Sequence, residues 1–300
     1  MIYQHPLAYL LGLEGVALLR AWAGDFDKDF VDRRLADVRR LLAAEALAGH
    51  DGVMVNSGDT LTGYRRWAPT YDEPRNSLFD ADEPVMHQII DALPPGDALD
   101  AACGTGRYAE YLAGRGHRVV GVDSSSDMLD RARARVPSGE FLLGDLRRLP
   151  LPDSCVDLIV SGLALCHVPT LVPVMAEFAR VLRPGGHLAI SDVHHEIAIR
   201  GSVPQALGPN DEPGLVRSYR HTPGDFLRAA LPAGLQVRRC EEPRGPDRDL
   251  PPPPPIPTDL TVTGWREWPW SLIALIPEAA RAAWAVPATI VWHFELLEPA

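Results

Sequence analysis

An aspartate, a short apolar strand and a glycine-rich turn follow one another in the segment DALDAACGTG, residues 97–106. The next strand-like run, HRVVGVD, ends on a second acid, Asp123. A glycine turn between a strand and a helix lets backbone N–H groups approach a ligand without an intervening side chain. A carboxylate at the end of the second strand can accept hydrogen bonds from ribose hydroxyls. Together these features predict a nucleoside-bearing cofactor at the edge of a parallel sheet.

The acids around the turn indicate which kind of nucleotide is bound. The turn GTGRYA also fits the G-x-G-x-x-A pattern of dinucleotide-binding folds, but that pattern alone is weak. Asp100, four residues before Gly104, is an unfavourable charge beside a pyrophosphate and a suitable partner for an ammonium group. Asp145, in FLLGDLRRLPLPD, could accept a hydrogen bond from an adenine amino group. These acids favour an adenosine carrying an amine over a dinucleotide.

Four motifs then occur in a fixed order within residues 97–193: LDAACGTG, GVDSSSDML, GDLRRLPLPD and VLRPGG. In this order they resemble the class I S-adenosylmethionine-dependent methyltransferases of the small-molecule type. The resemblance implies a Rossmann-like α/β fold, with a seven-stranded, mostly parallel sheet, helices on both faces and an antiparallel last strand. It also implies S-adenosylmethionine as cofactor and S-adenosylhomocysteine as product. Ala101 and Ala102 depart mildly from the larger-residue/glycine pair that is commoner in the family motif.

The resemblance also implies a cofactor site. Gly104 and Gly106 would let the loop pass close to the methionine part, with Asp100 beneath it, and Ser161 would lie at the methionine end. Asp123 would hold the ribose hydroxyls. The whole implied set is Tyr71, Asp100, Cys103, Gly104, Gly106, Asp123, Ser124, Met128, Asp145, Leu146 and Ser161.

Four further residues of this set would surround the nucleoside. By the same resemblance, Ser124 and Met128 would lie beside the ribose and adenine, and Asp145 and the backbone of Leu146 would face the adenine. Tyr71, in the YD element, is expected to cover the cofactor rather than to ionise, because an unperturbed tyrosine has a pKa of about 10. Tyr64 and Trp67 could join it as a lid, or pack on the core.

Histidines are the candidates for a general base. Transfer of an activated methyl group needs an aligned nucleophile, and it needs a base only when the acceptor must lose a proton. His167 follows the fourth strand, while His194 and His195 follow a strand that ends at the sheet edge where such folds bind ligands. Neighbouring strand residues point to opposite faces, so one of that pair at most should reach the pocket. A structural, hydrogen-bonded role is the alternative for each, and also for His221. The run His194–Glu196 matches no common zinc spacing, and we expect no metal.

Strand-like and helix-like runs alternate from residue 97 onward, which is typical of a parallel sheet covered on both faces. The predicted strands are Ala98–Ala102, Arg118–Val122, Glu140–Leu143, Val156–Ser161 and His187–Val193. The predicted helices are Glu83–Leu93, Arg107–Ala113, Asp127–Val136, Leu171–Leu182 and a short one from Thr222-Pro223 to Leu231. Leu235–Cys240 and Thr289–Leu297 are expected to pair as an antiparallel edge.

The flanking regions carry weaker signals. The first fifty residues predict two helices, the first ended by Gly24 and the second capped by Asp25. We expect an N-terminal helical extension at residues 1–60, acting as core packing, lid or dimer contact, and the methyltransferase-like domain at 61–300. A substrate-capping region is expected around 200–285, where late tryptophans could line a pocket or pack a helix over Ser271–Trp284. The proline tract at 251–255 should be extended.

Composition excludes several classes of protein. The 300-residue chain has a net charge of −11, which argues against nucleic acid and acidic membrane surfaces as partners. Its four cysteines form no CxxC pair, which indicates a reduced, intracellular protein. The apolar run at 7–23 lacks preceding basic residues and is interrupted by Glu14, so we expect no targeting segment, no membrane span and a cytoplasmic location.

The favoured interpretation is an enzyme that transfers a methyl group from S-adenosylmethionine to a small-molecule acceptor, at O or N rather than C. One alternative is an NAD(P)-dependent oxidoreductase on a Rossmann fold. Another is a fold member that binds the cofactor without transferring its methyl group, in which His167, His194 and His195 could all be replaced by alanine without loss of function. Homodimer formation through the N-terminal helices is a further expectation.

Overall fold

The structure is a computed structural model that describes residues 1–68, 71–72, 76–201, 204–208, 210–243 and 260–298. The chain divides into two compact units. The first contains residues 1–58, 196–216 and the described part of 247–286, and the second contains the rest. The proline tract at 251–255 lies outside the described residues. Within the described residues, no helix combines the length and apolarity needed to cross a bilayer.

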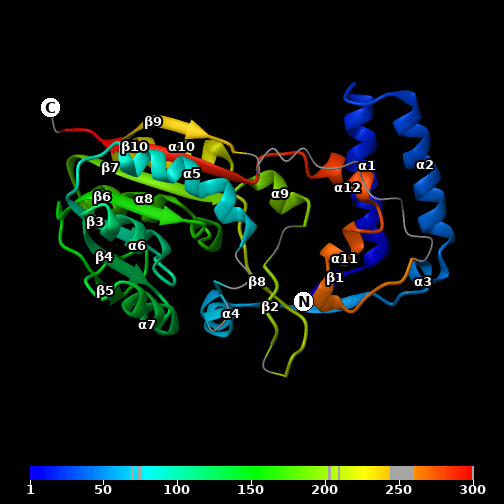
Figure 1. Cartoon of the computed structure of the whole chain (residues 1–300), viewed down its shortest axis with the longest axis horizontal. Coiled ribbons are helices and arrows are strands. Elements are labelled where there is room, and N and C mark those ends of the chain that lie inside the picture. Colours follow the sequence, from blue (N-terminus) through cyan, green and yellow to red (C-terminus); the bar gives the residue numbers. More distant parts are fainter. Residues whose placement is uncertain (69–70, 73–75, 202–203, 209, 244–259, 299–300) are drawn as a thin grey trace. The chain divides into compact units, whose positions relative to one another are not determined.

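The first unit consists of helices and a small sheet (Figure 1). Strand β2 lies between β1, to which it is antiparallel, and β8, to which it is parallel. Its core joins residues distant in sequence, such as Leu10 and Leu13 with Trp265 and Ala279. Its elements are β1 (Ile2–Gln4), α1 (Pro6–Trp22), α2 (Lys28–Ala43), α3 (Glu45–Ala48), β2 (Val53–Gly58), β8 (Gly214–Val216), α11 (Trp270–Ile273) and α12 (Pro277–Ala283). Helix α9 (His195–Ile199) begins at the boundary between the units.

An arginine is buried among carboxylates inside this unit. The Arg34 side chain on α2 is 1% exposed and pairs with Glu14 at 3.2 Å, Asp37 at 2.7 Å and Glu278 at 2.7 Å. Burial raises the pKa of Glu14 to about 7, against the opposing effect of Arg34. Because this folded-state pKa lies above the ordinary value, ionising Glu14 destabilises the unit as the pH rises toward 7. The arginine therefore offsets negative charge that α1, α2 and α12 bury together.

Replacing Arg34 with methionine should destabilise the protein by about 3–5 kcal/mol, because buried Glu14 loses its ion pair and Asp37 and Glu278 keep only Arg40 and Arg33. The free energy of unfolding in urea would measure this change. Arg39→Met is the matched control, since Arg39 is exposed on the same helix and its loss should change stability by less than about 0.5 kcal/mol. Equal effects of the two substitutions would contradict the assigned role of Arg34.

The second unit is built on a sheet of seven strands, counted over the described residues, in the order β5-β4-β3-β6-β7-β10-β9 (Figure 1). Strands β3 to β7 are parallel, and β10 runs antiparallel to both β7 and β9. The strands are β3 (Asp97–Ala101), β4 (Arg118–Asp123), β5 (Glu140–Leu143), β6 (Val156–Gly162), β7 (Leu182–Val193), β9 (Leu235–Glu241) and β10 (Thr289–Leu296). The helices are α4 (Thr60–Trp67), α5 (Ser77–Asp91), α6 (Arg107–Gly114), α7 (Ser126–Arg135), α8 (Val172–Val181) and α10 (Pro223–Ala230).

Helices cover both faces of this sheet. Ala98 faces a cluster with residues of α5, α6 and α7, while its neighbour Leu99 faces a cluster with residues of α8 and α10. This separation follows from the alternation of side chains along a strand. The carboxyl ends of β3, β4, β6 and β7 therefore share one edge, where the motifs predicted the site.

The predicted α/β fold with its antiparallel strand is confirmed. The five predicted parallel strands agree with β3 to β7, apart from β7 starting earlier, at Leu182. Two expectations were wrong. The second helix is capped by Asp27, whose Oδ1 accepts from Phe30 N at 2.9 Å, and the helix expected at 271–284 is divided before Pro277. Proline lacks the N–H that a continuous helix requires.

The predicted division into 1–60 and 61–300 stays a prediction. The structure adds that the N-terminal helices share a core with later segments, because Leu10 and Leu13 cluster with Leu272 and Ala283. Much of the region expected to cap the substrate, around 200–285, therefore belongs to the same compact unit as the N-terminal helices.

Candidate functional site at the carboxyl edge of the sheet

A tight glycine turn follows β3. Cys103 anchors it through two backbone bonds, since its N–H donates to Val122 O at 3.0 Å and its carbonyl accepts from Gly106 N at 2.8 Å. Gly104 and Gly106 have φ of +53° and +85°, values that L side chains rarely adopt. The Cys103 side chain is buried in the core cluster with α6 and α7, and burial raises the pKa of its thiol. Cys103 thus contributes its backbone to the turn.

The two glycines face different surroundings. A Cβ added to Gly106 would lie 3.2 Å from both Cα and Cβ of Ala132 on α7, so this glycine permits close packing of the turn on that helix. A Cβ added to Gly104 would meet no atom of the described residues within 4 Å, its two chain neighbours apart. The space beside Gly104 is therefore open, as the approach of a ligand to the backbone requires.

Asp123 connects the turn to the next helix. Its Oδ2 accepts from Gly104 N at 2.8 Å, and its Oδ1 accepts from Ser125 N at 2.8 Å. Burial raises the pKa of this carboxyl, and these backbone donors oppose the increase. Ser125 in turn caps α7 by accepting from Met128 N at 3.4 Å. Each carboxylate oxygen has further acceptor capacity, which leaves room for ribose hydroxyls.

A second acid lies beneath the turn. Asp100 at the end of β3 is 1% exposed, and its Oδ2 accepts from Ala109 N at 2.8 Å in the first turn of α6. Burial raises its pKa to about 7, with a smaller contribution from Asp123. The carboxyl therefore ties β3 to α6, which is the structural role that the sequence left open for it.

Ser161 lies near the end of β6 and is fully buried. Its hydroxyl oxygen has no hydrogen-bond partner among the described residues. A buried polar atom without a partner destabilises a folded protein by about 1–3 kcal/mol, so such atoms usually mark a water or ligand position. This observation supports the predicted place of Ser161 at the methionine end.

Aromatic side chains gather on the same unit. The ring of Tyr64 on α4 lies 5.1 Å from Trp67, 5.9 Å from Tyr71 and 5.3 Å from the imidazole of His167. Its hydroxyl lies 2.8 Å from His167 Nε2. The sequence analysis left Tyr64 as part of a lid or of the core, and it missed the pairing with His167 because the two residues lie 103 positions apart.

A hydrogen-bond network around Asp72 anchors the segment that contains Tyr71. The sequence did not indicate this network. Asp72 accepts from Thr105 Oγ1 at 2.9 Å, and from Arg135 Nη2 at 2.7 Å. Arg135 Nη1 also donates to Thr105 Oγ1 at 3.0 Å. These bonds tie the segment to the glycine turn and to α7.

Comparison with known proteins identifies this arrangement. Residues 99–190 match the family model described as a methyltransferase domain. This chain contains a class I S-adenosylmethionine-dependent methyltransferase domain. The predicted family and cofactor are thereby confirmed.

Curated relatives resemble part of the chain. It is 36% identical over 138 residues to malonyl-[acyl-carrier protein] O-methyltransferase of Serratia marcescens, covering 46% of this chain and 53% of that protein. It is 42% identical over 93 residues to the protein of the same name from Yersinia pestis, covering 31% and 35%. The chain thus spans about half or less of the relatives it matches.

A solved structure extends the likeness of fold. The S-adenosylmethionine-dependent methyltransferase from Mesorhizobium loti superimposes with a TM-score of 0.52 at 22% identity, covering 73% of this chain and all of that one. At this identity the likeness establishes the fold alone. None of these three proteins is named an oxidoreductase.

The remaining cofactor-binding predictions are compatible with the methyltransferase domain but untested. Ser124 is exposed beside Asp123, while Met128 is buried on α7. Asp145 accepts from the backbone and guanidinium of Arg147, and the Arg147 side chain lowers the pKa of this carboxyl. The side chain of Leu146 belongs to the core, so only its backbone is available to an adenine.

The candidate histidines have different partners. His194 is 1% exposed and pairs through Nε2 with Glu242 Oε1 at 3.0 Å, and its ring lies 4.4 Å from that of His195. His221 Nε2 lies 2.9 Å from Val168 O, as expected for a structural histidine. Of the four histidines, the structure brings His167 together with the aromatic cluster of α4. Catalytic roles for His194 and His195 stay predictions.

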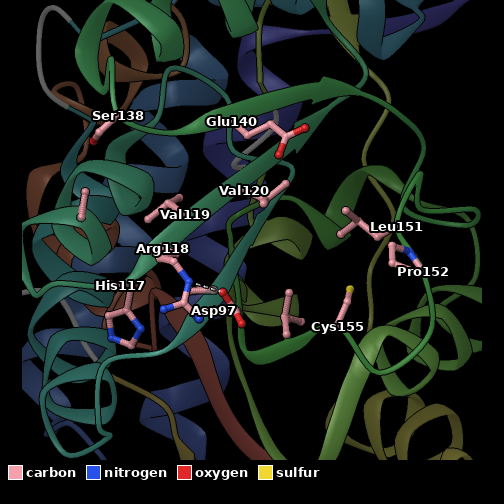
Figure 2. Close-up of a pocket in the computed structure, with 13 residues that line it drawn as sticks. Asp97, His117, Arg118, Val119, Val120, Ser138, Glu140, Leu151, Pro152 and Cys155 are labelled. Atoms are coloured by element: carbon pink, nitrogen blue, oxygen red, sulfur yellow. Dashed lines mark hydrogen bonds and ion pairs between the residues drawn. The ribbon is translucent and has the colours of Figure 1, made fainter.

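A cavity of about 570 Å³ opens at the opposite end of the sheet (Figure 2). It is lined by Asp97, Arg118, Glu140 and Val156, which begin β3, β4, β5 and β6. Asp97 and Arg118 form an ion pair of 2.7 Å across it. The cavity lies where these strands begin, whereas Asp123 lies at the other end of β4. The cavity is therefore separate from the cofactor motifs, and we assign it no role in methyl transfer.

The two turn glycines should respond differently to alanine. Each substitution should destabilise the fold by about 1–2 kcal/mol through left-handed backbone strain. Gly106→Ala should add packing strain against Ala132, whereas Gly104→Ala should mainly weaken S-adenosylhomocysteine binding, by about tenfold or more, by filling the open space. Urea unfolding and calorimetric titration would separate the two effects.

Gly114→Ala is the matched control, since a Cβ there meets no atom within 4 Å and Gly114 ends α6 without a left-handed φ. It should leave affinity unchanged. An unaltered cofactor affinity in Gly104→Ala would contradict the position assigned to the ligand.

Proposed function

We propose that this protein transfers the methyl group of S-adenosylmethionine to a small-molecule acceptor, at an oxygen or nitrogen atom rather than at carbon. The position of Asp123 carries the proposal. Its carboxylate lies at the end of β4 and holds the glycine turn, and both lie within the residues that match the family model. The open space at Gly104 and the unpartnered hydroxyl of Ser161 support it at the same edge.

The chain's residues act mainly by positioning. When bound, S-adenosylmethionine supplies a methyl group on a positively charged sulfur, already activated for displacement. Alignment of two reactants can lower a barrier by about 7–11 kcal/mol, so the site needs to hold the acceptor in line with that methyl group. Asp123 would orient the ribose, Asp100 and the turn would support the methionine part, and Tyr71 would exclude water.

A small acceptor is favoured by the charge of the chain. The net charge of −11 disfavours a nucleic acid substrate, because phosphate contacts require clustered lysine and arginine. The names of the two bacterial relatives refer to methylation at oxygen, which supports an oxygen acceptor here. A cytoplasmic location remains part of the proposal.

Asp123→Asn should weaken binding of S-adenosylhomocysteine by about 10- to 100-fold. Loss of a charged hydrogen bond costs about 1.5–3 kcal/mol, and the asparagine nitrogen would also face either Gly104 N–H or Ser125 N–H. Calorimetric titration measures the affinity. Asp130→Asn is the control, because Asp130 lies exposed on α7 with Arg133 as its partner. If Asp123→Asn bound as tightly as the unaltered protein, the cofactor position would be refuted.

We also propose a homodimer formed through α1, on which Leu19 and Trp22 are 70% and 92% exposed. Large exposed apolar side chains favour association because burying them removes apolar area from water. Sedimentation velocity should show a dimer for the unaltered chain and a monomer for the Leu19→Asp/Trp22→Asp double variant. A monomer at about 50 μM unaltered protein would count against the dimer.

A further inference from the structure

A tyrosine, a histidine and a backbone carbonyl form a chain of hydrogen bonds within the second unit. Tyr64 Oη lies 2.8 Å from His167 Nε2, and His167 Nδ1 lies 3.0 Å from the carbonyl oxygen of Arg217. The three groups come from α4, the 3-10 turn at Leu165–His167 and the strand-free segment after β8. The imidazole is therefore held at both nitrogens by different parts of the chain.

The partners decide where the imidazole hydrogen lies. A backbone carbonyl can only accept, so Nδ1 must carry the hydrogen that it donates to Arg217 O. Burial lowers the pKa of His167, and the bond to Arg217 offsets only part of that effect. A neutral ring with hydrogen on Nδ1 has a lone pair on Nε2, which accepts from the Tyr64 hydroxyl.

The surroundings keep the tyrosine protonated. Burial raises the pKa of Tyr64 well above its ordinary value, and the groups Tyr71, Cys166, Asp123 and Asp192 raise it further. One of these groups is Asp123, the carboxylate that would hold the ribose. Asp192, at the end of β7, accepts from Cys166 N at 3.1 Å and is itself buried.

The geometry points to a proton relay in which Tyr64 receives the acceptor's proton and passes its own to His167 Nε2, so that the acceptor is a hydroxyl compound rather than a carboxylate. This inference rests on the proposed methyl transfer and names the acceptor class for that site. A carboxylate has no proton to lose at neutral pH, and a relay would give its methylation no advantage. An alcohol or phenol must lose its proton as its oxygen is methylated.

The step balances in atoms and charge. The acceptor oxygen forms a bond to the methyl carbon while the bond from that carbon to sulfur breaks, and the bonding pair stays on sulfur. The acceptor O–H bond breaks toward the Tyr64 oxygen, and the Tyr64 O–H bond breaks toward His167 Nε2. The products are a methyl ether, a neutral thioether and an imidazolium whose Nδ1–H bond to Arg217 O persists.

The first test is spectroscopic and needs no acceptor. Nitrogen-15 NMR of the histidine rings, assigned with His167→Gln, should show hydrogen on Nδ1, an unprotonated Nε2 and a pKa below 6.5. Tyr64→Phe should remove the hydrogen bond at Nε2 and shift that nitrogen's resonance while leaving the Nδ1 hydrogen in place. Hydrogen on Nε2 instead, or no response of that nitrogen to Tyr64→Phe, would overturn the relay.

The second test reads the chemical class of the product. The protein is incubated with S-adenosylmethionine labelled in its methyl group and a deproteinised bacterial extract as the acceptor source. Label in methyl ethers survives alkaline hydrolysis, whereas label in methyl esters is released as methanol. We expect the label to be base-stable, and its rate of incorporation to fall at least about 100-fold in His167→Gln. In the unaltered protein this rate should decrease when the pH is below the pKa of His167. If the label were base-labile and His167→Gln still incorporated it, the inference would be overturned.

Two measurements keep this failure distinct from failure of the proposed function. S-adenosylhomocysteine affinity should stay within about twofold in His167→Gln and Tyr64→Phe, which also verifies that both variants fold. His187→Gln is the control variant, because His187 lies on β7 with His293 as its partner at 3.1 Å. Unaltered protein that fails to bind S-adenosylhomocysteine would contradict the function itself, whereas binding with a methyl ester product would contradict the relay alone.

Discussion

The site depends on a carboxylate that holds two backbone donors from separate loops. Asp123 accepts from Gly104 N in the glycine turn and from Ser125 N before α7, and thereby fixes the turn against the helix start. Backbone N–H groups converging on a buried acid offset the cost of desolvating it. The acid that would hold the ribose is thus also the support of the loop that would pass beside the methionine part. One side chain therefore holds the glycine turn and, as proposed, the ribose.

The other acids of the edge follow the same arrangement. Asp100 accepts from Ala109 N and Asp192 accepts from Cys166 N, and burial raises the pKa of Asp100 to about 7 and of Asp192 to about 6. Each carboxyl joins the end of a strand to the segment that follows a neighbouring turn. Low local polarity makes each of these bonds stronger than it would be in water. Buried hydrogen bonds from three carboxyls therefore hold the carboxyl edge together.

Sequence reasoning found the sheet because strands and glycine turns leave local signals, while the cofactor-site residues that it named stay predictions. The glycine turn directly follows β3 and Asp123 ends β4, and short apolar runs such as Glu140–Leu143 identify the strands. The pairing of Tyr64 with His167, and of Asp72 with Arg135, joins residues far apart in sequence. No periodicity encodes such pairs. For the same reason the shared core of the N-terminal helices with residues 260–286 could not be anticipated.

Backbone strain is stored at the same edge as the acids. Ala102, after β3, has a φ of +59°, and Leu163, after β6, has a φ of +54°. A left-handed backbone costs a non-glycine residue about 1–2 kcal/mol, so the surrounding structure must hold both residues in place. Leu163 is held by its N–H bond to Ser191 O at 2.8 Å, and the strand end that it fixes leads into the turn of His167. Ala102 departs mildly from the family motif, which commonly has glycine here. It thus occupies a conformation that glycine would adopt freely. The strained residues thus lie beside the glycine turn and the histidine turn, at the edge where we propose that the cofactor binds.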